Sequence, residues 1–441
     1  MVFGTGVMRA LYACFFVRGL TVGIAAASSL FISQRTGVSQ TVLVACRGVG
    51  LVLGPTAFGR IIGRMVWSGE SQSGVTLALT TKAICGLLMP RAKSYIILYI
   101  GFFVMGLTMA AMDTICNYLV AKCYGKKTGG KLIVYDAVYM SGCMLAPFVA
   151  VATLDRAWDL LAGLDLLLAL SIGGKRACVG KPRDWKRKIR GPVANGSCAA
   201  DNGSSPRAPP QPLAQSEPRP SRAVLSTGVA YIFVAQVVQA SISCWGFTFA
   251  ATVLRLPHKL AAMLPSAFAF GAISTRIFVV LPASTRVLPS SLCHAGCCLT
   301  LICSTILCLL VRMHTGMVGP ELEEDEATVM PTWLLYCFLV VMACMGAGLC
   351  ANNSMMLGAM QLHGTLSSQE VGWYNTSFCL GTTLGMSLPG MVGLPRVEIL
   401  GSLCLFLVIN SRRADFPRTG ALPKEELAAV AAEEAPNGKA S

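Results

Sequence analysis

The chain has 441 residues, of which 54% are hydrophobic and only 13% are charged. This composition excludes a water-soluble protein, because a chain of this length could not bury so much apolar surface behind so few charges. The net charge of +15 does not indicate a nucleic-acid partner, because most Lys and Arg residues lie between apolar segments.

Apolar segments recur along nearly the whole chain. A helix of about 20 such residues can cross a hydrocarbon core of about 30 Å. The pattern predicts an all-α membrane protein with twelve transmembrane helices, at residues 10–33, 40–62, 74–91, 94–120, 130–153, 157–173, 223–253, 259–282, 289–311, 332–358, 371–393 and 397–410. The opening MVFGTGVMR continues directly into the first span, so no cleavable signal peptide is expected.

The distribution of basic residues predicts the orientation and the domains. Lys and Arg are concentrated in the segments that are cytosolic if the N-terminus is cytosolic, which by the positive-inside rule places both termini there. The basic and then Pro- and Ser-rich stretch between the sixth and seventh spans has the composition of a disordered connection. The predicted parts are an N-terminal six-helix bundle (1–173), a cytosolic linker (174–222), a C-terminal six-helix bundle (223–410) and a cytosolic tail (411–441).

The fourth predicted span, GLTMAAMDTICNYLV, carries Asp113 and Asn117 in apolar surroundings. Residues four apart lie on one helical face, so the two side chains point the same way. An ionisable side chain at the centre of a bilayer costs at least about 2.5–3.5 kcal/mol, so it normally faces a cavity or a partner. Asp113 with Asn117 therefore either lines a central cavity, or the Asp113 carboxylate forms a salt bridge with Arg18 or Arg47 that joins two helices.

The second half of the chain adds amide and aromatic side chains within predicted spans. Amides offer paired donors and acceptors that suit sugar hydroxyls, and an aromatic ring suits the apolar face of a sugar. The alternative is structural, since amides also join membrane helices and Trp often anchors the end of a span. The candidate substrate-binding residues are Asp113, Asn117, Arg47, Gln236, Gln239, Trp245, Asn352, Asn353, Trp373 and Asn375.

Two further acidic residues lie within predicted spans. Asp136 is a second candidate, beside Asp113, for binding a coupling ion, and Asp165 lies in the sixth span without an evident partner.

The remaining residue types indicate no enzyme chemistry. The 19 cysteines are scattered through the spans as small apolar side chains, so neither a metal site nor a disulfide framework is expected. The sequence has no phosphate-binding loop, nucleophile elbow or zinc-protease helix, so we expect neither an enzyme nor a cofactor.

Two sets of six spans joined by a basic linker resemble the major facilitator superfamily, whose members hold their substrate between two pseudo-symmetric halves. Gly63-Arg64 is similar to the superfamily's signature after the second span, although Arg60 replaces the usual acidic residue. Four segments resemble the fourth, eighth, tenth and eleventh spans of the sodium-dependent glucose transporter group. They are GLTMAAMDTICNYLV, LPSAFAFGAISTRIFVVLPASTRVLP (264–289), GAGLCANNSMMLGAMQLHG (346–364) and GWYNTSFCLGTTLGMSLPGMVG (372–393).

The resemblance implies a monomeric secondary transporter in the plasma membrane that moves a small polar solute, a hexose-type sugar, by alternating access. Sodium or a proton would be the coupling ion, but Gln239 stands where family members carry a glutamate, so coupling does not follow from the resemblance. One alternative is a small organic anion transporter, with the charge supplied by Arg18, Arg47 and Arg276. Another is a membrane receptor or scaffold that acts through its basic linker and tails.

Overall fold

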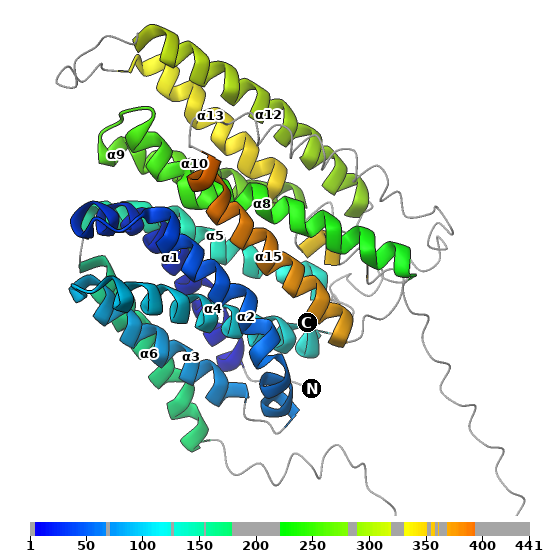
Figure 1. The fold of residues 1–441 in the computed structure, drawn as a ribbon. Coiled ribbons are helices and arrows are strands. Elements are labelled where there is room, and N and C mark those ends of the chain that lie inside the picture. Colours follow the sequence, from blue (N-terminus) through cyan, green and yellow to red (C-terminus); the bar gives the residue numbers. More distant parts are fainter. Residues whose placement is uncertain are drawn as a thin grey trace, which may run out of the picture.

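The computed structural model describes residues 5–67, 71–124, 128–153, 156–178, 221–280, 289–318, 330–350, 354–357, 360 and 368–392. Within these ranges every regular element is a helix (Figure 1). Eight of the described helical segments are long and apolar enough to cross a membrane. The all-α membrane class predicted from composition is thus confirmed for the described residues.

The described helices follow the predicted spans closely. The first part of the chain forms α1 (Thr5–Thr36), α2 (Gln40–Trp67), α3 (Ser71–Leu88), η1 (Met89–Arg91), α4 (Tyr95–Tyr124), α5 (Thr128–Thr153) and α6 (Arg156–Cys178). The second part forms α8 (Arg222–Thr252), α9 (His258–Ala261), α10 (Met263–Thr275), η3 (Arg276–Val280), α12 (Pro289–Val318), α13 (Thr332–Leu349) and α15 (Ser368–Val392). The predicted twelfth span at 397–410, the tail at 411–441 and linker residues 179–220 lie outside the described residues.

The two parts of the chain repeat one packing pattern. In the first part α1 packs along α5 and α2 along α4, and α3 lies against α4 and α6. In the second part α8 packs along α15, α10 along α13, and α12 against α13. Contacts between the parts join α2 to α15, α5 to α10 and α1 to α8, while α3 with α6 and α12 with α13 lie on opposite sides of the molecule (Figure 1).

Glycines allow the equivalent helix pairs in each part to approach closely. A methyl group on Gly106 of α4 would collide with the carbonyl oxygen of Arg47 on α2. In the second part, a methyl group on Gly346 of α13 would collide with the carbonyl oxygen of Phe268 on α10. Because lipid tails are as apolar as the helices, membrane helices associate through such close packing rather than by the hydrophobic effect. The small residues in these spans therefore set the helix positions.

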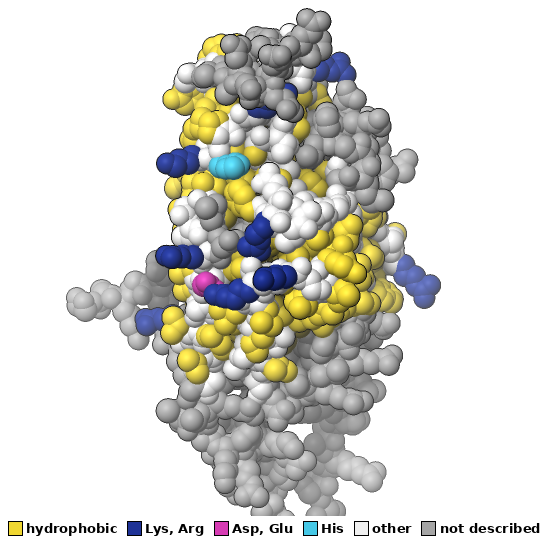
Figure 2. Space-filling view, turned by 60° about the vertical axis from the view of Figure 1, so that its left-hand side comes forward, with side chains coloured by type: hydrophobic (Ala, Val, Ile, Leu, Met, Phe, Trp, Pro, Cys, Tyr) yellow, Lys and Arg dark blue, Asp and Glu magenta, His cyan; other side chains and the backbone are white. Residues whose placement is uncertain are grey.

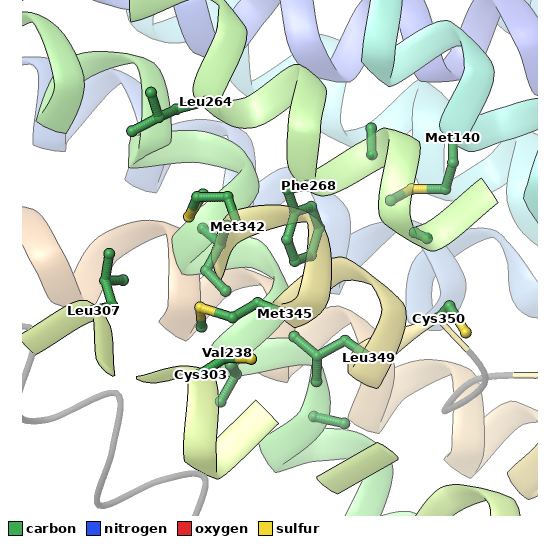
Figure 3. Packing of buried hydrophobic residues seen from close by; sticks show 14 of the residues in the cluster. Met140, Val238, Leu264, Phe268, Cys303, Leu307, Met342, Met345, Leu349 and Cys350 are labelled. Atoms are coloured by element: carbon green, nitrogen blue, oxygen red, sulfur yellow. The ribbon is translucent and has the colours of Figure 1, made fainter. Parts of the chain in front are cut away.

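One buried apolar cluster extends from the interior of the second part to α5 of the first. Met140 of α5 belongs to one buried cluster with Phe268 of α10 and with Met342 and Met345 of α13 (Figure 3). Met345 is fully buried. Unbranched methionine side chains adapt to irregular gaps, which suits Met140 to the contact between α5 and α10, and Met342 and Met345 to the interior of the second part.

Large hydrophobic side chains also cover the outside of the described helices (Figure 2). Leu77 of α3, Ile96 of α4 and Leu170 of α6 are 63%, 52% and 70% exposed. A soluble monomer rarely exposes a continuous apolar surface of this kind, whereas hydrocarbon chains solvate it well. The exterior thus agrees with a helical protein that spans a bilayer.

Candidate functional site

A cavity lies between the two parts, near the middle of the long helices. The space inside it that water-sized molecules can occupy is about 50 Å³, which is smaller than the range of about 300–1,000 Å³ for typical small-molecule sites. The first part of the chain lines it from α1, α2, α4 and α5, and the second part from α8 and α15. The polar lining residues include Arg18, Arg47, Tyr139, Gln236, Gln239 and Thr382. Both parts of the chain thus contribute to one site.

Arg47 of α2 is the cationic group of the cavity wall that lacks a partner among the described residues. Its side chain is buried, with a relative exposure of 2%. The Nε atom has no hydrogen-bond partner, and no ion pair joins the guanidinium group to a described carboxylate. A buried cation without a counter-charge is strongly unfavourable, so this group requires an explanation in the function of the site.

Two glutamines of α8 line the same cavity. The Gln236 amide Nε2 donates a hydrogen bond of 3.3 Å to Oε1 of Gln239. Gln236 is buried and Gln239 is half-buried. This bond uses one donor and one acceptor, so the amide nitrogen of Gln239 keeps its two donors for a ligand. Arg47, Gln236 and Gln239, which were predicted as substrate-binding residues, are brought together at one cavity.

Arg18 of α1 also lines the cavity, but its charge is matched. Its Nε atom forms an ion pair with Oδ1 of Asp113 on α4, and its guanidinium carbon lies 4.7 Å from the centre of the Tyr139 ring. Neither Asp113 nor Asn117 is among the described residues that line the cavity. Arg18 rather than Arg47 is thus the partner of Asp113, and the pair joins α1 to α4 directly behind the cavity wall.

The other predicted residues are dispersed. Trp245 is buried, and its indole nitrogen donates a 2.6 Å hydrogen bond to the carbonyl oxygen of Met386, which is itself a lining residue. Trp373 is 52% exposed, and neither it nor the half-buried Asn375 is among the described residues of the lining. Asn352 and Asn353 lie outside the described residues.

Asp136 of α5 lies beside Arg276, away from the cavity lining. The Arg276 Nη1 atom donates a 3.1 Å hydrogen bond to the backbone carbonyl of Asp136, and Nε donates one of 2.8 Å to the carbonyl of Cys350. The Asp136 carboxylate also interacts electrostatically with Arg276. This cluster connects α5 to η3 and to the end of α13, so it ties the two parts of the chain together.

Sequence reasoning did not find the partner of Asp165. Its carboxylate lies 2.8 Å from Nζ of Lys82 on α3, and the Lys82 ammonium group also donates a 3.0 Å hydrogen bond to Thr21 of α1. The sequence did contain a signal for this pair, because Lys82 in the third predicted span and Asp165 in the sixth are charged residues in apolar segments, where each needs a partner.

Ser243 and Thr382 were also not predicted as part of the site. Gln236, Gln239 and Ser243 are three and four residues apart along α8, so helical periodicity places them on one face. The same spacing relates Phe378 to Thr382 on α15. The signal was thus present in the sequence, but a serine or threonine in a membrane helix is too common to indicate a site.

The comparison with known proteins agrees with this architecture. No curated protein matches the chain. The family model of the Major Facilitator Superfamily matches residues 11–386, from the start of α1 to the cavity-lining part of α15. With a match over most of its length, the chain belongs to the major facilitator superfamily.

Proposed function

We propose that this chain moves a small polar solute by alternating access, with the solute bound in the cavity that Arg47, Gln236 and Gln239 line. Membership of the superfamily makes it a secondary transporter of some solute in a lipid bilayer. The observation that carries the proposal is the position of the cavity, which lies between the two parts and is lined by both. A site shared by two moving halves can be exposed to each side of a membrane in turn.

The proposed architecture is two pseudo-symmetric six-helix bundles, with the twelfth helix at 397–410. The repeated packing of α1 on α5 and α8 on α15, and of α2 on α4 and α10 on α13, supports it. We propose that both termini and the linker are cytosolic, which the distribution of Lys and Arg supports, and that the protein resides in the plasma membrane.

Alternating access requires contacts that open at one end of the cavity. Where α1 ends and α2 begins, Nε2 of Gln40 donates hydrogen bonds to Ser29 on α1 and to Thr248 on α8, at 2.9 and 3.0 Å. Nearby, the rings of Phe31 and Phe247 meet edge to face with centroids 5.9 Å apart. With a cytosolic N-terminus, these contacts close the outer end. They break when the protein opens outward, and the bound solute shifts the balance between the two states.

Two features bear on the alternatives drawn from the sequence. A hexose would find amide groups in Gln236 and Gln239, but the indole N–H of Trp245 is already bound to Met386. A receptor or scaffold has no need for an unpaired cation inside a cavity, so Arg47 favours transport over that class. For ion coupling we propose the carboxylates of Asp113 and Asp136, since each lies beside an arginine whose pairing could change with the state of the transporter.

The experiment that tests the proposal is uptake into liposomes that contain the purified protein. Labelled solutes are offered with and without sodium and pH gradients, and the thermal unfolding of the same preparation shows that the protein is folded. We expect saturable exchange of at least one small polar solute, and a lower rate for Gln239→Ala, because a lining donor is lost. The proposal fails if folded protein exchanges none of the sugars or anions offered. Loss of gradient-driven accumulation in Asp113→Asn or Asp136→Asn would identify the coupling carboxylate.

A further inference from the structure

We infer that the transported solute is an anion, a carboxylate or a phosphate, and that the guanidinium group of Arg47 recognises its negative charge. The inference rests on the proposed function and deepens it by naming the substrate class of the same cavity. Four features of the molecule support it: the pairing of the cations, the desolvation of Arg47, the geometry of the guanidinium group, and the neutral donors beside it.

The buried and half-buried cations of the described helices differ in their pairing. Arg18, which is half-buried, is paired with Asp113, and Lys82 is paired with Asp165. Arg276 donates hydrogen bonds to two backbone carbonyls, one of them that of Asp136. Arg47 has neither an ion pair with a described carboxylate nor a hydrogen bond from its Nε atom. Within the described residues, the lining of the cavity therefore carries one unmatched positive charge.

Burial makes this unmatched charge significant. A guanidinium group is a permanent charge in proteins, so burial has to be balanced by a partner. Its relative exposure is 2%, and its Nε atom is without a hydrogen-bond partner. Removing an ion from water without a partner costs several kcal/mol. A ligand anion would supply the missing partner, whereas a neutral sugar would leave the charge uncompensated.

The geometry of the guanidinium group restricts the class of anion that the site would bind. Its N–H donors form a planar fork that matches the two oxygens of a carboxylate or of a phosphate. Across the cavity the amide nitrogen of Gln239 adds neutral donors, while the Gln236 amide is partly engaged by its bond to Gln239. A single cation surrounded by neutral donors suits a small anion that also carries polar groups.

Two variants of Arg47 and one matched control test the inference. Arg47→Gln removes the charge, and Arg47→Lys keeps the charge but loses the fork. Arg91→Gln makes the same change at an exposed ion pair with Asp159, far from the cavity lining. Each protein is first examined in detergent for the rise in unfolding temperature caused by succinate, pyruvate, inorganic phosphate or D-glucose. Each is then reconstituted in liposomes for exchange of the same labelled compounds.

We expect at least one of the three anions to stabilise and exchange with the unmodified protein and with Arg91→Gln. In Arg47→Gln its affinity falls by at least about 10-fold, because a hydrogen-bonded charge pair is lost. Arg47→Lys lies between the two. Exchange of D-glucose with no effect of any anion would overturn the inference and leave the proposed transport intact. Anion binding that Arg47→Gln does not weaken would also overturn the inference without contradicting transport. Anion binding that depends on Arg47 without any exchange would instead retain the anion site and refute transport.

Discussion

Asp159 and Asp165 lie on the same helix, α6, but form ion pairs in opposite surroundings. The Arg91–Asp159 pair is open to solvent, with side-chain exposures of 60% and 38%. The Lys82–Asp165 pair is almost completely buried, with exposures of 3% and 1%. An exposed pair contributes about 0–1 kcal/mol to stability, whereas removal of one partner of a buried pair leaves an uncompensated charge.

We therefore predict that Asp165→Asn destabilises the protein much more than Asp159→Asn does. The expected loss is about 3–5 kcal/mol for Asp165→Asn, because the Lys82 ammonium group stays buried, and under about 1 kcal/mol for Asp159→Asn. Thermal unfolding in one detergent measures both. Equal unfolding temperatures for the two variants would show that Lys82 is not confined as the structure indicates.

At the scale of single residues, the sequence predicts that polar side chains of the spans face the protein interior rather than lipid, but it does not predict which residue each one contacts. Arg47, Gln236 and Gln239 were predicted as substrate-binding residues and do line one cavity. For Asp113 the sequence left open a place in the cavity or a salt bridge with Arg18 or Arg47, and its carboxylate pairs with Arg18. Helical periodicity gives the direction of a side chain relative to its own helix, whereas its partner depends on how the helices are rotated against each other.

At the scale of helices, the close contact between α2 and α4 couples packing to the cavity. Gly106 of α4 lies against the backbone carbonyl of Arg47, so the absence of a side chain at Gly106 determines how near α2 can approach. Hydropathy located the helices within a few residues, because a bilayer dictates their length and composition. Their pairing could not be predicted, because small residues favouring close packing occur in nearly every span.

We predict that Gly106→Leu destabilises the protein and weakens solute binding, because α2 must move away and take Arg47 with it. Overpacking of this kind costs about 1–3 kcal/mol or more. Gly163→Leu is the matched control, because no atom lies within 4 Å of a Cβ atom built at Gly163 on α6. Unfolding temperature and uptake are measured for both variants. Unchanged values for Gly106→Leu would contradict the close contact of α2 and α4.

At the scale of the whole molecule, the bonds of Gln40 hold the two parts together at one end. The Gln40 Nε2 atom lies 3.0 Å from Oγ1 of Thr248, across the boundary between α2 and α8. We predict that a short bis-methanethiosulfonate cross-link between Gln40→Cys and Thr248→Cys stops transport, because this end can no longer open. Uptake into liposomes is measured after cross-linking and again after reduction, which releases the cross-linker and should restore uptake.

The single variants Gln40→Cys and Thr248→Cys, treated with the same cross-linker, control for the native cysteines of the chain. Continued uptake by protein that is demonstrably cross-linked would show that this end does not open during the transport cycle. Within the described residues, the family match and the repeated helix packing agree with a molecule of two halves, but only such a measurement reveals which end moves.

The contact between α5 and α10 has a mechanical consequence. Met140 of α5 belongs to one buried cluster with Phe268 of α10, across the boundary between the two parts of the chain. Its side chain has three rotatable bonds and no branch at the β carbon, so it can exchange rotamers with little change in energy. A boundary filled in this way can shear without leaving empty space, whereas interlocked β-branched side chains would have to separate first. A flexible thioether there would thus let the two parts slide in the proposed transport cycle, while the close glycine contacts keep the helix pairs within each part together.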